Sequence, residues 1–431
     1  MFDISALYNP NVLYVILGCL LMSVSASTVG TFTFLRKKSL IGDAVAHAIL
    51  PGICLAFILN GTKNPLYLIP GAFLTGWLSI LLVDAITHHS KIKQDAAISI
   101  VLSVFFGAGI WLLTVIQHSG MDNQSGLDAF LFGKAAALTS FDVWVFGVVA
   151  LLLIAAVWAF YKEFQLLSFD KDFAQSIGYK TQLLELLLSG LTVLAIVTGI
   201  QAVGVVLMAS LLIAPAATAR FWTDKLHVMI FIAILISSVS AIIGASVSYI
   251  APSMPTGPWI VMVLSLSAVF TFIFAPHKGI VVKWLKQRGN QKQMLEENIL
   301  KTFYYLTQTA IADKHYFSLT DIQNQRSLSH STLGKGLETL IRQGYIERER
   351  ERERERGDKQ DRYGLTKEGL QQGKRVAHLH RLWELYLTEY LRIAPDHVHD
   401  DAETIEHVLT PELQARLEII LGNPEIEPEV K

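Results

Sequence analysis

The sequence predicts an all-α polytopic membrane bundle of about nine transmembrane helices, followed by a smaller soluble part with a winged helix-turn-helix and a helical segment. The 431 residues are 52% hydrophobic and 17% charged, with a mean hydropathy of +0.41, which is too apolar for a soluble chain. The charges gather at one end: residues 291–431 hold 20 of the 36 Lys and Arg and 25 of the 37 Asp and Glu. The first two thirds are therefore expected to lie in lipid and the last third in water.

Nine apolar runs qualify as transmembrane helices when the chain is read with a window of about 19 residues. They fall at 11–34, 41–60, 66–87, 95–117, 141–161, 183–201, 202–222, 226–250 and 255–275. Small residues inside several runs, such as SVSAS at 23–27, allow helix backbones to approach closely. The stretch 118–140 lies between two ends on the same side and has room for a short re-entrant helix.

The soluble third divides further by composition and pattern. The predicted organisation is a transmembrane domain at 1–280, a polar linker at 281–293, a winged helix-turn-helix domain at 294–370, a helical segment at 371–424 and a tail at 425–431.

Positive charges in the short loops predict the orientation of the bundle. One set of alternating loops carries ten Lys and Arg, and the other set carries only Lys63 and Lys134. The ten-cation side is predicted to be cytoplasmic, with the N-terminus outside and the C-terminus inside. We expect a multi-pass protein of the cell inner (plasma) membrane with a cytoplasmic C-terminal domain. The first apolar run lacks a basic leader and a small-residue cleavage site, so we expect no cleavable signal.

Asp43 and His47 stand in the motif GDAVAHAILPG, at 42–52, which opens the second predicted span. Their i, i+4 spacing places a carboxylate and an imidazole on one helix face. This donor pair suits Mn²⁺, Fe²⁺ or Zn²⁺ better than Mg²⁺ or Ca²⁺. In the alternative interpretation, Asp43 caps the helix near the membrane boundary and His47 bonds a neighbouring carbonyl. Two ligands do not close a metal site, so others would come from another helix or a second copy of the chain.

Other polar or reactive residues of the spans indicate less. Glu185 and Gln201 could line a cavity or pair with backbone groups. The two cysteines, Cys19 and Cys54, lie in apolar runs, so neither a disulfide framework nor a Cys-based zinc site is expected.

The segment FDKDFAQSIG at 169–178 lies in a loop predicted to be cytoplasmic. Asp170 or Asp172 can cap a short helical turn, and Gly178 can end it. We expect a short amphipathic helix across the inner surface, although taken alone it could be any connector.

Three segments together resemble the metal-specific ABC-3 family of ABC transporter permeases: RKKSLIGDAVAHAILPG at 36–52, the loop at 170–178 and GVVLMASLLIAPAATAR at 204–220. The resemblance covers about residues 10–280. It implies a homodimeric permease that imports manganese, zinc or iron, and in which Asp43 and His47 bind the passing metal. A homodimer would bring two such pairs to one axis.

The resemblance also implies how the import is driven. In the family, the matching loop is the coupling helix that docks on the ATPase; the corresponding residues here are Asp170, Asp172, Ala174 and Gly178. The chain has no GxxxxGK[ST] phosphate-binding loop. We therefore expect a transport subunit that is not itself an enzyme, with a separate ABC ATPase and an extracytoplasmic metal-binding receptor protein as partners.

The soluble third begins with a helix from about residue 295 and continues with helix-turn-helix signals. Ser318 can cap a short helix that ends near Gln325, and Ser329 can cap a second that ends at Gly344. Strands from Tyr345 and at 362–365 would form the wing of a winged helix.

The second of these helices would offer four polar side chains to a DNA groove: His330, Ser331, Thr332 and Lys335. Support for DNA binding is weak, because residues 291–431 carry a net charge of −5, from 20 basic and 25 acidic residues. Ten strictly alternating Glu and Arg residues at 347–356 could place five Arg on one face of a strand against phosphate. A solvated charged arm is the alternative.

Carboxylates and imidazoles recur at helical spacing near the end of the chain. They are His380, Glu384, Glu403, Glu406 and His407. Such i, i+3 and i, i+4 pairs suit a second Mn²⁺ or Fe²⁺ site, and surface salt-bridging helices are the alternative.

Residues 294–424 resemble the iron- and manganese-dependent repressors of the diphtheria toxin repressor family. The resemblance implies that these five tail residues take part in metal binding and that the tail helices form a dimer. One feature departs from the pattern: Asn298 and Lys301 stand where manganese-responsive members carry acidic ligands. The sensor site therefore lacks two of the acidic side chains that the resemblance implies.

These features favour the permease subunit of an importer of Mn²⁺, Zn²⁺ or Fe²⁺, with a fused metal-responsive regulatory domain. The divalent metal would be the substrate and also a regulatory ligand. A membrane-tethered metal-dependent transcriptional regulator is the alternative from another class. In a third interpretation the soluble domain serves only to clamp a dimer.

Overall fold

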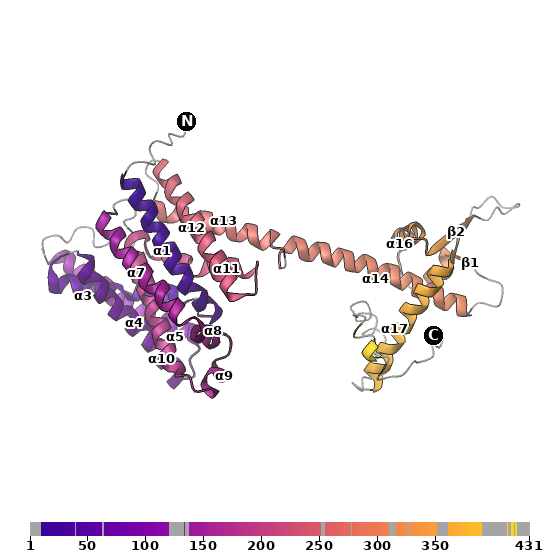
Figure 1. Cartoon of the computed structure of the whole chain (residues 1–431), viewed down its shortest axis with the longest axis horizontal. Helices are drawn as coiled ribbons and strands as arrows, with labels where there is room; N and C mark the ends of the chain where they lie inside the picture. Colours follow the sequence, from indigo (N-terminus) through magenta and orange to yellow (C-terminus); the bar gives the residue numbers. More distant parts are fainter. Residues whose placement is uncertain are drawn as a thin grey trace. The chain divides into compact units, whose positions relative to one another are not determined.

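The computed structural model describes residues 10–38, 40–62, 64–119, 133, 138–250, 255–276, 278–309, 316–325, 328–350, 361–389, 412, 415–417 and 419. The chain forms two compact units, Met1–Val282 and Lys283–Lys431, here named the membrane unit and the C-terminal unit (Figure 1).

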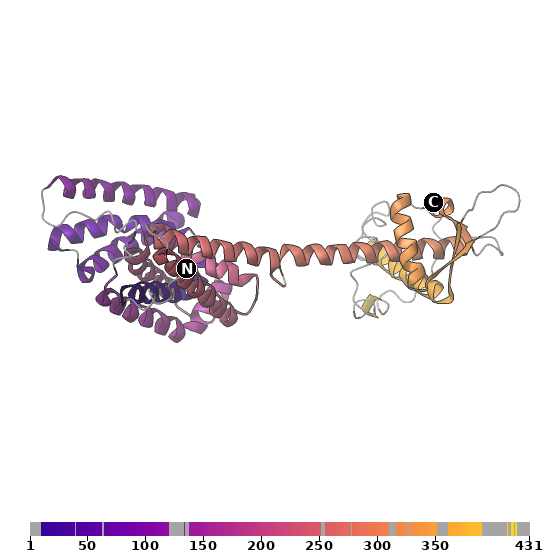
Figure 2. The ribbon, with the colours of Figure 1, turned by 90° about the horizontal axis from the view of Figure 1, so that it is seen from above.

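All the secondary-structure elements that the structure describes in the membrane unit are helices. Its helices are α1 (Pro10–Leu35), α2 (Ile41–Ala48), α3 (Leu50–Asn60), α4 (Pro65–His89), α5 (Gln94–His118), α7 (Ser140–Ala159), α8 (Tyr161–Phe169), α9 (Lys171–Ser176), α10 (Thr181–Val203), α11 (Val205–Arg220), α12 (Leu226–Ile250) and α13 (Thr256–Phe274). Their side-by-side packing into one bundle can be followed in Figures 1 and 2.

Within the described residues, eight helices are long and apolar enough to cross a membrane, with α2 and α3 counted together as one. The ninth predicted span, at 202–222, corresponds to α11, which has only 16 residues. It is short because Gly204, with a φ of 82°, turns the chain directly after α10. A helix of that length extends about 24 Å, less than the ~30 Å hydrocarbon core of a bilayer. Most of 118–140 lies outside the described residues.

Small residues let α1 pack closely against its neighbours, as the Ser-rich run predicted. The Ser237 hydroxyl of α12 donates to the Ser23 carbonyl oxygen of α1 at 3.2 Å and to the Ser27 hydroxyl at 3.1 Å. Gly30 lies against the Leu212 carbonyl of α11, where a Cβ atom would collide with backbone. These contacts join α1 to α11 and α12 at the centre of the bundle.

Ion pairs connect several helix ends on the side of the bundle that the loop charges predict to be cytoplasmic. Arg36, directly after α1, pairs with Glu185 near the start of α10. Lys278, after α13, and Arg220, at the end of α11, both pair with Asp224 before α12. The end of α11 therefore returns to the same side as the end of α13, in keeping with the predicted topology.

The C-terminal unit holds a small antiparallel sheet with helices packed on it (Figure 2). Its elements are α14 (Ile280–Thr309) from Lys283 onward, β1 (Tyr316–Ser318), α15 (Leu319–Gln325), α16 (His330–Arg342), β2 (Ile346–Arg350), β3 (Asp361–Leu365) and α17 (Lys367–Glu389). The residues 281–293, which we expected to form a polar linker, lie within α14. This stretch contains no proline to interrupt the helix.

The predicted helix-turn-helix and wing are present. Ser318 and Ser329 accept hydrogen bonds from the N3 amides of α15 and α16, at 3.2 Å each. Gly344, with a φ of 80°, follows α16 and leads into β2. Strand β2 pairs antiparallel with β3, so that Ile346 lies opposite Leu365. Strand β1 was not predicted, because three residues are too few to show an alternating pattern.

Candidate functional site

The candidate metal ligands of the membrane unit lie on α2, which is a separate helix of eight residues. The chain breaks between α2 and α3 because Pro51 has no N–H with which to bond the carbonyl of His47. Asp43 occupies the first turn of α2 and His47 the last. A carboxylate near a helix N-terminus interacts favourably with the helix dipole.

Asp43 and His47 are neighbours, as their spacing predicted. The His47 Nε2 atom lies 3.6 Å from the Asp43 Oδ1 atom, and the side chains are 30% and 55% exposed. The His47 ring meets the edge of Phe106 on α5, with 5.0 Å between ring centroids. Its Nδ1 atom is buried and has no hydrogen-bond partner among the described residues. Because a transition metal lies about 2.1 Å from nitrogen and oxygen ligands, one ion can reach both donor atoms across this gap.

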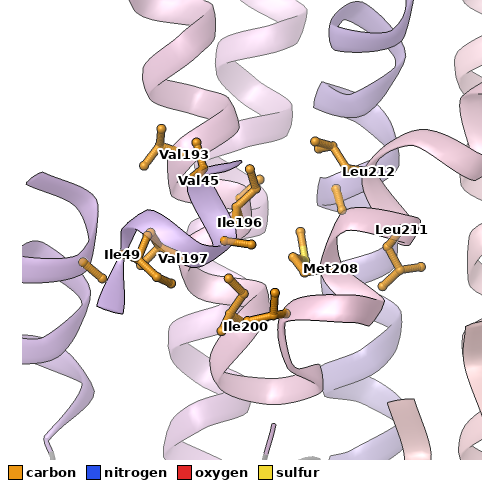
Figure 3. Close-up of a cluster of buried hydrophobic side chains, with 14 of the residues drawn as sticks. Val45, Ile49, Val193, Ile196, Val197, Ile200, Met208, Leu211 and Leu212 are labelled. Carbon is orange, nitrogen blue, oxygen red and sulfur yellow. The ribbon is translucent and has the colours of Figure 1, made fainter. Parts of the chain in front are cut away.

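The opposite face of α2 is firmly packed. Figure 3 shows Val45 and Ile49 beside α10 and α11, within a cluster that also includes Val193, Ile196, Val197, Ile200, Met208, Leu211 and Leu212. On the side of α4, Gly76 leaves room for the packing. A Cβ atom there would lie 3.0 Å from Ile49 and Val193 and 3.2 Å from Val45. Apolar burial thus holds the helix while Asp43 and His47 stay accessible.

The described residues of one chain do not complete a metal site. They contain no group of three or more His, Cys, Asp and Glu side chains placed to hold an ion. A metal ion held by the pair on α2 would need further ligands from beyond these residues, from solvent or from a second chain.

The segment predicted to be a coupling helix is α9. Asp170, rather than Asp172, is its N-cap and accepts a hydrogen bond from the Phe173 amide at 2.9 Å. Ala174 is buried, and Gly178, with a φ of 91°, ends the turn.

Four large apolar side chains around α9 are exposed, between 41% and 55% of their surface. They are Phe169, Phe173, Ile177 and Tyr179. An exposed apolar group of this kind, bordered by charged residues, is typical of a protein-binding surface.

Sequence reasoning missed the ion cluster beside α9. The Glu185 Oε1 atom lies 2.6 Å from Arg36 Nη2 and 3.1 Å from Lys171 Nζ. Glu185 had been expected to line a cavity or bond backbone. Burial lowers the pKa of the Arg36 guanidinium, while the charges of Glu185 and Asp84 raise it. In the sequence, the one indication of this ion cluster is the position of Glu185, a single carboxylate inside an apolar run and five residues after Lys180.

In the C-terminal unit, the structure brings together two of the predicted tail residues. His380 is 1% exposed, and its Nε2 atom lies 3.1 Å from Glu384 Oε1. The other oxygen, Glu384 Oε2, accepts a hydrogen bond from Arg381 Nη1 at 3.3 Å. Lys301 of α14 is also buried, at 3% exposure. Glu403, Glu406 and His407 lie outside the described residues.

The proposed DNA-reading helix exposes the predicted side chains. His330, Ser331, Thr332 and Lys335 are all exposed on α16, opposite the buried face that contains Leu333 and Leu337. Of the alternating Glu and Arg run, only 347–350 is described; there Arg348 pairs with Asp361 across β2 and β3.

The long apolar helices, with the short helices α2 and α9 between them, define a polytopic membrane protein. The chain belongs to the ABC 3 transport family, whose model matches residues 9–275. A second model, that of the iron dependent repressor metal binding and dimerisation domain, matches residues 366–431. The predicted ABC-3 resemblance is confirmed, and the predicted repressor resemblance is confirmed over 366–431.

Known transport proteins are similar in sequence to most of this chain. The manganese transport system membrane protein MntC of Bacillus subtilis (strain 168) is 38% identical over 390 residues, or 90% of this chain and 86% of that protein. The zinc transport system membrane protein TroC of Treponema pallidum (strain Nichols) is 41% identical over 275 residues, or 64% and 92%. Among solved structures, PsaBC from Streptococcus pneumoniae in complex with Fab is similar with a TM-score of 0.59 and 30% identity, covering 66% of this chain and 98% of that one.

Proposed function

We propose that the chain is the permease subunit of an ATP-driven importer whose substrate is a divalent transition metal, Mn²⁺, Zn²⁺ or Fe²⁺. The observation that carries this is the accessible Asp43–His47 pair on a short helix within an otherwise apolar bundle. One oxygen and one nitrogen donor suit these ions better than Mg²⁺ or Ca²⁺. The names of the relatives, which mention manganese and zinc, support the same range of substrates.

A homodimer supplies the ligands that one chain lacks. Two copies related by a two-fold axis present two carboxylates and two imidazoles. Four such donors satisfy the tetrahedral preference of Zn²⁺, and water completes the larger coordination spheres of Mn²⁺ and Fe²⁺. The exposure of Asp43 and the absence of a third donor among the described residues support this arrangement.

A separate ABC ATPase drives transport by docking on α9. The chain has no phosphate-binding loop of its own. Phe173 and Ile177, both about half exposed on or beside α9, offer the apolar contact, while Asp170 and Gly178 define the ends of the segment. An extracytoplasmic receptor protein delivers the metal to the opposite end of the bundle.

The C-terminal unit acts as a metal-responsive regulator and dimerisation module in the cytoplasm. The repressor-domain match at 366–431 and the His380–Glu384 pair support this role. Chains cut after Asn290 test it in inside-out vesicles with Mn²⁺ added on the cytoplasmic face. Loss of inhibition by internal Mn²⁺ is expected, and unchanged inhibition would contradict the regulatory role.

The central proposal is tested by uptake of Mn²⁺, Zn²⁺ and Fe²⁺ in vesicles that contain the permease, its ATPase and its receptor. The variant with Asp43→Ala and His47→Ala should lose uptake of every ion, while Asp95→Asn, at an exposed position in the first turn of α5, should retain it. Normal uptake by the double variant would disprove the proposal. Metal-stimulated ATP hydrolysis, titrated with each ion, identifies the preferred substrate.

A second candidate function is regulation of transcription from the membrane, favoured by the exposed polar face of α16. Its distinguishing experiment is DNA footprinting with the full-length chain in detergent, with and without Mn²⁺. Protection of a specific sequence, lost in Lys335→Ala, would favour it over a purely transport role.

A further inference from the structure

One helix, α10, touches both the segment that we propose as the ATPase docking site and the helix that carries the substrate ligands. Glu185, near its start, pairs with Lys171 of α9. Two turns further on, Val193, Ile196 and Val197 face α2 in the cluster of Figure 3. A displacement of α10 therefore moves the packed face of α2.

The ion cluster at Glu185 gives α9 a second connection to α2. A single carboxylate oxygen, Glu185 Oε1, is shared by Arg36 and Lys171. The side chains of Arg36 and Glu185 are only 8% and 23% exposed, so that pair is held firmly, since breaking it leaves a buried charge without compensation. Lys171 is 48% exposed, so its bond is weak and easily exchanged.

Arg36 also begins the tight turn that leads from α1 into α2. The turn is closed by the amides of Lys37 and Lys38, which donate to the carbonyls of Phe34 and Thr33 at 3.0 Å and 3.2 Å. Lys37 has a φ of 57°, in the left-handed region that non-glycine residues rarely adopt. The Lys38 carbonyl in turn accepts a hydrogen bond from the Ile41 amide of α2 at 3.2 Å, so a movement of Arg36 reaches the start of α2, where Asp43 lies in the first turn.

We propose that Arg36, Glu185 and Lys171 form a positioning triad that transmits the movement of α9 to the helix of the substrate ligands. Lys171 is the exchangeable contact that responds to the docked ATPase, and Arg36–Glu185 is the fixed contact that carries the response into the bundle. The proposal rests on the proposed function, in which α9 docks the ATPase and α2 holds the metal.

The test measures coupling in vesicles that contain the full-length permease, its ATPase and its receptor. The readout is the number of Mn²⁺ ions taken up per ATP hydrolysed, with Zn²⁺ as a second probe. Lys171→Gln should lower this ratio by at least about fivefold, the lower range of coupling between sites, and Lys171→Arg should restore it. Lys180→Gln, at an exposed position beyond the other end of α9, is the matched control and should leave the ratio unchanged.

A second variant removes the buried part of the triad without leaving a lone buried charge, since Lys171 is 48% exposed. Arg36→Met combined with Glu185→Leu replaces both charges by apolar side chains, a change that buried ion pairs commonly tolerate. It should fold, copurify with the ATPase and show the same loss of coupling as Lys171→Gln. An unchanged ratio in either variant would overturn the proposal.

Two further outcomes would also count against the triad. Loss of the ATPase from the Lys171→Gln complex would make Lys171 a docking residue, and an equal loss of coupling in Lys180→Gln would show a general effect of charge. The variant with Asp43→Ala and His47→Ala tests the proposed function separately, because it removes the ligands and leaves the triad intact.

Discussion

Two pairs of side chains in this molecule share one spacing and differ in their surroundings. Asp43 and His47 on α2 and His380 and Glu384 on α17 are both carboxylate–imidazole pairs at i, i+4. The first pair is 3.6 Å apart and accessible. The second is 3.1 Å apart, its imidazole is 1% exposed, and its carboxylate also binds Arg381.

A carboxylate and an imidazole at this spacing do not by themselves make a site that a metal ion can enter and leave. In the C-terminal unit a fixed guanidinium already neutralises part of the Glu384 charge, so an incoming metal must compete with it. In the membrane unit, the described residues hold no cation within ion-pair distance of Asp43 other than His47 itself. The arrangement on α17 favours a structural or slowly exchanging role, and the arrangement on α2 favours rapid passage.

The largest expected effect is on the rate of metal uptake, which should depend on the pair on α2 and not on the pair on α17. Asp43→Asn or His47→Gln alone should reduce uptake by more than about a hundredfold, since even loss of an outer-shell partner of a metal ligand costs 10- to 100-fold. Uptake of radiolabelled Mn²⁺ in vesicles measures this. The matched change Glu384→Gln should leave the maximal rate without internal metal within a factor of about two, the size of one helix-surface contact. Equal losses in both pairs would remove the distinction.

Stability should show the reverse order. Glu384→Gln should lower the free energy of unfolding of the C-terminal unit by about 1–3 kcal/mol, because the buried His380 and the adjacent Arg381 lose an ionised partner. Asp43→Asn should change stability by less than about 0.5 kcal/mol, as expected of an accessible side chain. Denaturant unfolding of the full chain in detergent, followed separately for the two units, measures both. A larger loss in Asp43→Asn would contradict the assignment.

Removal of the Arg381 guanidinium tests whether this cation competes with a metal ion for the Glu384 carboxylate. Arg381→Gln frees one oxygen of Glu384, so Mn²⁺ binding by the C-terminal unit should tighten about tenfold, the size of one charge-assisted hydrogen bond. Calorimetric titration of a chain that carries Asp43→Ala and His47→Ala isolates this binding. Arg375→Gln, exposed on the same helix, should have no effect. Unchanged or weaker binding in Arg381→Gln would show that Arg381 does not compete.

The smallest expected effect on uptake comes from the length of the helix on which the ligand pair lies. Helix α2 ends after eight residues before Pro51, whereas α17 runs without interruption for 23 residues. Pro51→Ala restores the missing N–H, joins α2 to α3 and should slow Mn²⁺ uptake about fivefold by turning the ligand face, a loss within the range of coupling energies. Leu50→Met is the control, since it leaves the break in place. A rate equal to that of the control would show that the break has no role.

Much of the fold follows from local pattern. Long apolar runs predicted the membrane helices because lipid forces each segment to satisfy its own backbone hydrogen bonds. The caps at Ser318 and Ser329 were predicted, and the cap of α9 was narrowed to Asp170 or Asp172, because capping depends on a few adjacent atoms. The length of α11 was not predicted, because hydropathy does not detect the turn at Gly204.

The sequence by itself determined the membrane character of this protein, the carboxylate–imidazole spacings and the place of the amphipathic segment, because each depends on periodicity along the chain. Only the tertiary structure decided that Glu185 joins Arg36 to Lys171, that Arg381 occupies the carboxylate of Glu384, and that the apolar face of α2 rests on α10. These contacts connect residues on different helices or select one rotamer among several. The residue pattern along a single helix does not predict these contacts or rotamers, because they are decided by the packing of side chains in three dimensions.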